Sequence, residues 1–127
     1  MFADVEALLV AYLQPLTGIQ GVSVDLPPDV LQRLPFIQVN RVAGSDNYIT
    51  DSPLVDVECF DATRAKSSAV ARTVHAAMMR LRHTAVAGVL VDSVETVTGP
   101  FWLNYENENL QRYVATYLVE TRVGAAP

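Results

Sequence analysis

Two segments in which apolar and polar side chains alternate, 35–42 and 54–60, decide the fold class of this chain. Successive side chains of a β-strand point to opposite faces, so a period of two predicts two half-buried strands. The residues between them, 44–53, are mostly polar and too numerous for a tight turn. We therefore expect a long antiparallel hairpin with a polar tip.

Two other segments carry apolar residues at helical spacing. The first, 2–13, is followed by Pro15 and Gly18, which are expected to end the helix. The second, 63–84, has Asp61 and Thr63 as alternative N-caps. Its expected core stripe consists of Val70, Val74, Ala77, Met78 and Leu81.

Three more strands are expected, at 22–25, 88–98 and 110–122. A Gly99-Pro100 corner should end the strand 88–98, before a loop that carries the single tryptophan, Trp102. Consecutive strands with short links form antiparallel sheets, and the helices must then cover one face. The expected fold is α+β, a two-layer sandwich with two helices packed on one face of a mostly antiparallel sheet of about four to five strands.

The composition is that of one globular domain over residues 1–127, half of them hydrophobic. No apolar run is long enough to span a bilayer, and the acidic N-terminal segment differs from a signal peptide, so we expect neither membrane insertion nor secretion. The single cysteine, Cys59, excludes an internal disulfide and fits a reducing compartment.

The charge is unevenly distributed: the net charge of −5 divides into −6 for residues 1–60 and +1 for residues 61–127. One stretch without an acidic residue holds Arg64, Lys66, Arg72, Arg80 and Arg82. An acidic half and a basic element in one small domain can complement each other between copies. A solvated helix face accounts for the basic stretch equally well. The acidic balance of the whole chain disfavours strong nucleic-acid binding.

Catalytic patterns are not evident. His75 and His83 lie eight residues apart, whereas metal-binding pairs on a helix use spacings of three or four, so we expect no metal. Cys59 is expected to be a small buried hydrophobe. Asp56 and Glu58 share a strand face and are interpreted as a solvated or partner-facing edge rather than an acid/base pair. We expect no enzyme and no cofactor; the alternative is a small enzyme or ligand-binding domain centred on Cys59, Asp56 and the histidines.

Three features are not required for packing the hydrophobic core, and all three indicate contacts with other proteins. They are the hairpin tip, the Trp102 corner and the basic side of the second helix. The expected interface with a neighbouring subunit or a partner protein consists of Asp46, Asn47, Tyr48, Ile49, Asp51 and Trp102. The expected basic helix surface consists of Arg72, His75, Arg80 and Arg82.

Several short phrases carry a family resemblance. They are Pro-Phe-Ile-Gln-Val-Asn-Arg (35–41), Thr-Asp-Ser-Pro (50–53), Val-Asp-Val-Glu-Cys-Phe (55–60), Gly-Pro-Phe-Trp-Leu-Asn-Tyr-Glu-Asn-Glu-Asn (99–109) and Arg-Tyr-Val-Ala-Thr-Tyr-Leu-Val-Glu-Thr-Arg (112–122). In this order, and over roughly residues 2–122, the chain resembles the tail terminator proteins of long-tailed phages (siphoviruses) that infect actinobacteria.

The resemblance implies a structural protein that assembles as a hexameric ring on the last ring of tail-tube subunits, stops tube growth and gives the neck of the filled head a docking surface. The implied partners are further copies of the chain, the tail tube protein and a neck or head-completion protein, with DNA only in passage through the lumen. The implied location is the tail–neck junction of the virion, after assembly in the host cytoplasm.

By position, the tip around 46–51 should reach a neighbouring subunit or the tail tube. The helix cations Arg72, Arg80 and Arg82 should face the next subunit or the lumen. The alternative in the same class is a neck or head-closure ring protein, which would bind the portal or adaptor instead of the tail tube.

Overall fold

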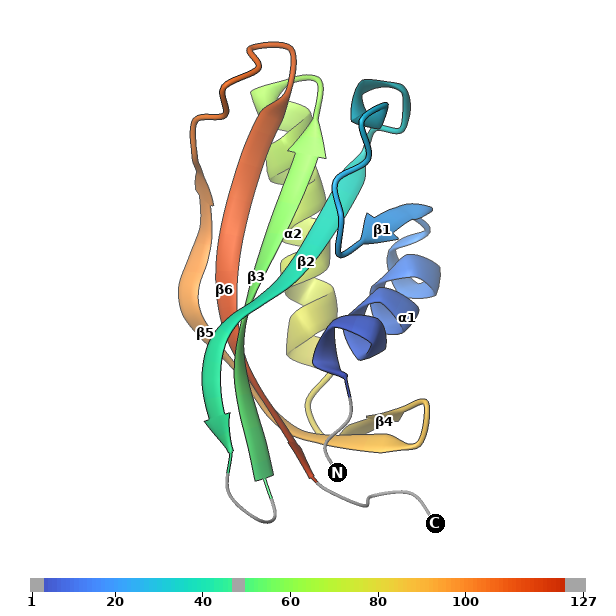
Figure 1. Ribbon diagram of the computed structural model, residues 1–127, viewed down its shortest axis with the longest axis vertical. Coiled ribbons are helices and arrows are strands. Elements are labelled where there is room, and N and C mark those ends of the chain that lie inside the picture. The colour runs from blue at the N-terminus through green and yellow to red at the C-terminus, as the bar shows by residue number, and fades with distance from the viewer. Residues whose placement is uncertain (1–3, 47–49, 123–127) are drawn as a thin grey trace.

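The computed structural model describes residues 4–46 and 50–122 (Figure 1). Its helical elements are α1 (Val5–Thr17), the short 3₁₀ helix η1 (Val30–Gln32) and α2 (Arg64–Arg80). Its strands are β1 (Gly21–Ser23), β2 (Phe36–Asp46), β3 (Thr50–Asp61), β4 (Thr84–Val86), β5 (Val89–Trp102) and β6 (Gln111–Arg122). Over these ranges the strands form one sheet in the order β1-β2-β3-β6-β5-β4, with β1 parallel to β2 and the other neighbours antiparallel.

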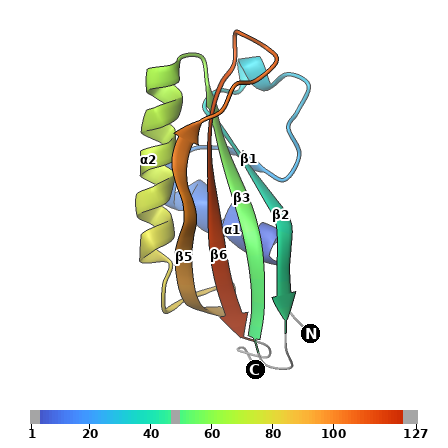
Figure 2. The same ribbon diagram turned by 90° about the vertical axis from the view of Figure 1, so that its left-hand side faces the viewer.

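Both helices cover the same face of the sheet (Figure 2). α2 packs across β3, β6 and β5, whereas α1 packs against β1, β2 and α2. Every second side chain of the central strands fills the core between the layers, as Val57 of β3 and Tyr117 of β6 illustrate. The expected α+β fold with two helices packed on a sheet is confirmed.

Local signals in the sequence set the helix boundaries. The Asp4 carboxylate caps α1 by accepting hydrogen bonds from the backbone N–H groups of Glu6 and Ala7. Gly18, at φ +74°, ends α1 in the left-handed conformation that glycine adopts without strain. Of the two expected caps of α2, Thr63 is the one used, since its hydroxyl accepts a hydrogen bond from the N–H of Lys66.

The expected number of four to five strands is too low, since the described residues form six; the sheet is mostly antiparallel as expected, and the parallel pair β1–β2 makes it mixed. The additional strand is β4, which begins where the second helix was expected to end. α2 ends at Arg80, and the left-handed backbone of His83 (φ 58°) and Ala87 (φ 51°) turns the chain into β4 and then into β5. A strand of three residues is too short to show a period in the sequence.

The strand β5 also continues past the Gly99-Pro100 corner that was expected to end it. Its pairing with β6 shifts between Thr98 and Phe101, so the ladder omits both corner residues. Proline cannot donate a ladder hydrogen bond and is therefore tolerated at bulges and on edge strands. β5 is such an edge beyond the three residues that pair with β4.

The helix-free face of the sheet is covered at one end only. There Val30, Phe36, Phe60 and Leu110 form a second buried cluster, against which Leu26, Leu34 and Tyr105 pack. The remainder is here called the open sheet face; it carries Leu54, Asp56 and Glu58 of β3, Thr116, Leu118 and Glu120 of β6, and Glu95 of β5. These side chains are half-buried, apart from the exposed Glu95.

An ion pair within the long β2–β3 hairpin and a hydrogen bond from it to α1 hold the hairpin in place. The Arg41 guanidinium binds both oxygens of the Asp51 carboxylate, at 3.0 and 3.1 Å, and Asp51 is only 1% exposed. The backbone N–H of Arg41 donates a 2.9 Å hydrogen bond to the carboxylate of Glu6 in α1. The hairpin is thereby linked both within itself and to the first helix.

Gly44 should be irreplaceable in this hairpin. Its φ is +130°, and a Cβ atom there would lie 2.5 Å from the carbonyl oxygen of Ser52. We expect Gly44→Ala to lower the free energy of unfolding by about 1–3 kcal/mol, measured by denaturant titration. Gly99→Ala is the matched control, because a Cβ atom at Gly99 has no neighbour within 4 Å. Equal stability of the two variants would contradict this assignment.

The Arg41–Asp51 pair should contribute far more stability than the exposed Arg33–Asp29 pair. Arg41→Ala leaves a buried carboxylate without its cation, so we expect a loss of about 2–3 kcal/mol in the free energy of unfolding. In the second pair both side chains are about half exposed, at 58% and 46%, so Arg33→Ala should cost no more than about 1 kcal/mol. Similar losses in thermal or denaturant unfolding would show that burial does not set the difference.

Candidate assembly surfaces

The described part of the hairpin tip has one exposed carboxylate, Asp46, and one buried carboxylate, Asp51. The expected contact residues Asn47, Tyr48 and Ile49 lie outside the described residues. Asp46 is exposed and pairs in the ladder with Asp51. Because the Asp51 carboxylate is buried against Arg41, it serves the hairpin itself, and Asp46 is the described acidic group that the tip presents to solvent.

Trp102 ends β5 and pairs with Tyr113 near the start of β6, whereas the hairpin tip adjoins the end of β6, so the two lie at opposite ends of the sheet. Its Nε1 donates a 3.0 Å hydrogen bond to Oε1 of Gln111, and the Arg64 guanidinium lies 4.6 Å from its ring centroid. The indole is half-buried and joins the β5–β6 connection to the start of α2. The apolar groups exposed beside it are Phe101 (41%) and Leu103 (40%).

The outward surface of α2 is basic, but two expected members of it, His75 and Arg82, form hydrogen bonds with the sheet. Nδ1 of His75 lies 2.9 Å from the Tyr117 hydroxyl in a hydrogen bond, so this half-buried imidazole contacts the sheet. Burial raises the pKa of Tyr117 well above its usual range, so the hydroxyl stays protonated. Arg82 donates from Nε to the carbonyl oxygen of Val94 in β5 at 3.0 Å.

Three exposed cations of α2, Lys66, Arg72 and Arg80, are here called the basic helix face; Arg64, which is also exposed, lies against the Trp102 ring instead. None of the three forms an ion pair with any residue in 4–46 or 50–122. The small residues Ala65, Ala69 and Ala76 lie exposed among them. Lys66 was part of the basic stretch in the sequence but not of the expected contact set.

The open sheet face carries carboxylates that the sequence did not place together. Glu120 accepts hydrogen bonds from Ser93 (2.8 Å) and Ser52 (3.3 Å) on the two flanking strands. Asp56 accepts one from Thr116 at 2.6 Å, and Arg112 forms a 3.0 Å ion pair with Glu58. The shared face of Asp56 and Glu58 was predicted from their spacing, whereas the proximity of β6 and β5 depends on strand order.

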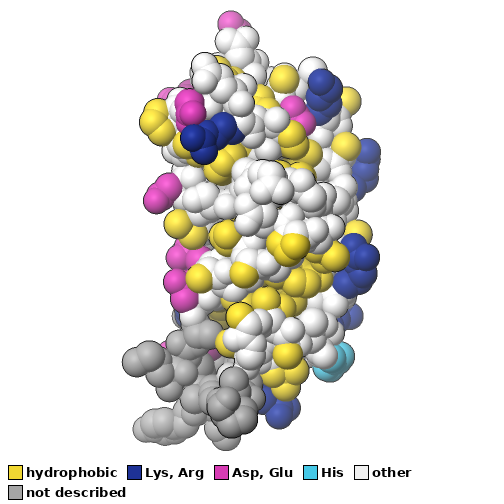
Figure 3. Space-filling model, turned by 90° about the vertical axis from the view of Figure 1, so that its right-hand side faces the viewer, with side chains coloured by type: hydrophobic (Ala, Val, Ile, Leu, Met, Phe, Trp, Pro, Cys, Tyr) yellow, Lys and Arg dark blue, Asp and Glu magenta, His cyan; other side chains and the backbone are white. Residues whose placement is uncertain are grey.

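These two charged surfaces lie on opposite sides of the molecule. In Figure 3, most Lys and Arg side chains lie along one edge of the view and most Asp and Glu side chains along the other, and the two kinds mix only near the top. Since α2 and the open sheet face are the two outer layers of the fold, the segregation follows from the two-layer architecture. One subunit thus has a basic side and an acidic side.

The groups of the expected alternative enzyme site do not converge. Cys59 faces the helices and Asp56 faces the open side of the same strand, while His75 contacts Tyr117. Burial raises the pKa of the Cys59 thiol to about 12, which disfavours the nucleophilic thiolate. In the part of the chain that the structure describes, no three His, Cys, Asp or Glu side chains gather as a metal site, and no helix is long and apolar enough to cross a membrane.

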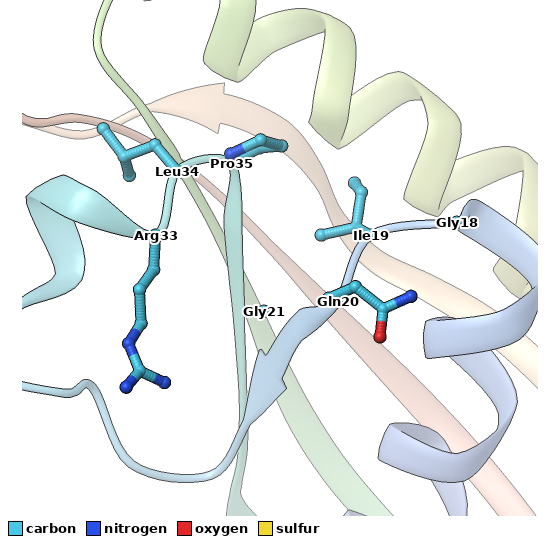
Figure 4. Close-up of a pocket in the computed structure, with 7 residues that line it drawn as sticks. All are labelled: Gly18, Ile19, Gln20, Gly21, Arg33, Leu34 and Pro35. Atoms are coloured by element: carbon cyan, nitrogen blue, oxygen red, sulfur yellow. The ribbon is translucent and has the colours of Figure 1, made fainter.

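An open pocket of about 490 Å³ lies between the end of α1 and the start of β2 (Figure 4). Its lining consists of Gly18, Ile19, Gln20, Gly21, Arg33, Leu34 and Pro35. Arg33 is the one charged residue of this lining, and its guanidinium is paired with Asp29 at 3.0 Å. The lining therefore offers an apolar hollow without a general acid, a general base or a nucleophile.

The Cys59 thiol should not react with thiol reagents in the folded protein. At about pH 8 an exposed thiol is partly ionised and reacts quickly with an aromatic disulfide reagent, whereas Cys59 should react only after unfolding. The measurement is the labelling rate with and without denaturant, with an exposed cysteine at Ala69 in a Cys59→Ala background as the reactive control. Fast labelling of native wild-type protein would refute the burial argument.

Comparisons with known proteins give the family. A family model described as phage tail termination protein matches residues 1–124. No curated protein matches the sequence. Among solved structures, a chain from the virion of a native gene transfer agent particle is similar in fold, with a TM-score of 0.63, 14% identity and coverage of 92% of this chain and 93% of that chain. Because the family model spans almost the whole sequence, this chain belongs to the phage tail termination proteins, structural components of the virion tail.

Proposed function

We propose that this protein caps the tail tube of a long-tailed phage of actinobacteria as a hexameric ring. The cap stops tube growth and then offers the docking surface for the neck of the filled head. The match to the tail termination family over residues 1–124 carries this proposal. The shared fold with a chain of a gene transfer agent virion supports it.

The two ends of the sheet suit the two sides of such a ring. The hairpin tip, with Asp46 and the neighbouring 47–49, would reach the tail tube on one side. The exposed Phe101 and Leu103 lie at the other end, where the neck protein would dock. Polar loops with exposed apolar groups at their ends are usual contact surfaces between proteins.

The ring would work at the tail–neck junction of the virion, after assembly in the host cytoplasm. DNA would pass through its lumen without being retained. A chain with a net charge of −5 attracts phosphate weakly, which suits passage rather than binding.

Capping can be tested directly with tail-tube protein that polymerises in vitro. Added wild-type protein should shorten the tubes and appear as a ring at one tube end in electron micrographs. A Tyr48→Ala, Ile49→Ala variant should cap poorly, whereas Leu31→Ala, an exposed apolar change at the other end of the molecule, should cap normally.

Two results would reject this proposal. One is a tube length that does not change when the protein is added. The other is binding to the portal or adaptor with none to the tube, which would identify a neck or head-closure ring protein instead.

A further inference from the structure

The cations and the carboxylates of this fold lie in different outer layers, the cations on α2 and the carboxylates on the open sheet face. The stretch from Ala62 to Val91 contains no Asp or Glu, and its solvent-facing cations on α2 are unpaired within the described residues. Solvated helices of stable proteins commonly carry pairs of opposite charge at spacings of three or four. α2 carries like charges instead, which suits a surface that meets an acidic partner.

The open sheet face has the complementary charge. It presents Asp56, Glu58, Glu95 and Glu120, and the register places the cations Arg112 and Arg122 on the same face. Arg112 pairs with Glu58 and Arg122 with Asp92, so Asp56, Glu95 and Glu120 have no cationic partner among the described residues. The hydroxyl groups of Ser52, Ser93 and Thr116 orient two of these carboxylates without neutralising them. The carboxylates are thus held in place by neutral donors and remain available to a cation from outside.

The shapes of the two surfaces also permit contact. Alanine side chains separate the cations of α2, so the helix backbone can approach a neighbouring surface closely. On the open sheet face, Leu54 and Leu118 lie opposite each other in the ladder between the acidic positions and offer apolar area to such a helix.

We propose that the basic helix face of one copy docks on the open sheet face of the next copy. This contact rests on the proposed function for its purpose, since repeated around an axis it would be the lateral contact of the capping ring. A surface that binds a different surface of the next copy generates a closed ring when the rotation closes. Complementary charge sets the orientation of such a contact and makes it sensitive to salt.

The test reverses the charge of one surface in each of two variants and then mixes the variants. The helix-reversed variant carries Arg72→Glu with Arg80→Glu, and the sheet-reversed variant carries Glu95→Lys with Glu120→Lys. Each variant alone has two surfaces of like charge, so its association should be more than tenfold weaker than that of the wild type. In an equimolar mixture every alternating contact joins opposite charges again, so assembly should return, in even copy numbers only.

Association is measured by sedimentation at low and high salt and by the rings seen on tube ends. A cooperative thermal unfolding transition shows that each variant is folded. If the sheet-reversed double variant is unstable, the single variant Glu95→Lys replaces it. The charge-matched control is Glu106→Lys with Glu108→Lys, in an exposed loop segment away from the open sheet face; it should assemble like the wild type.

Three results would overturn this contact. Folded reversed variants could assemble like the wild type, or their mixture could fail to restore assembly. The helix-reversed variant could instead lose DNA binding with unchanged assembly, which would assign the basic helix face to nucleic acid. If wild-type rings cap tubes and the reversed variants cap equally well, the contact fails and the proposed function stands; if the wild type forms rings neither in solution nor on tubes, both fail.

Discussion

The pairing of β3 with β6 is the constraint on which the rest of this structure depends. Because side chains alternate along both strands, the register places Val57, Ala115 and Tyr117 on the helix side. The same register places Asp56 and Thr116 on the open side. A slip of one residue would bury the carboxylates and expose the tyrosine, so the core and the charged surface are specified together. The helices then have one face of the sheet on which they can pack.

Much of the fold could be predicted because its long elements are periodic. The hairpin, α1, α2 and β6 each extend over enough residues for a period of two or 3.6 to show. The short strand β1 was expected at 22–25, but its parallel pairing was not, and β4 was not expected at all. β1 pairs in parallel because the chain returns through residues 24–35 before it enters β2, and β4 depends on the left-handed residue His83. Neither feature leaves a repeating pattern.

The charged surfaces were only partly predictable, since their residues are joined by strand order rather than by spacing. The basic stretch was evident, but His75 follows the buried Val74 directly and turns to Tyr117 at the flank of the core stripe. Asp51 was expected at a contact and instead anchors the hairpin through Arg41. Glu95 and Glu120 come together because β5 lies beside β6 in a shifted register, which the sequence alone does not specify.

The irregular outer edge of β5 has a consequence for the free subunit. An uncovered strand usually offers its backbone as a template for edge-to-edge aggregation. Here the register shifts three times along β5, and Pro100 lacks a donor, so the edge lacks an even row of hydrogen-bonding groups. The free subunit therefore lacks, along this edge, the regular strand on which a second copy could add by backbone pairing.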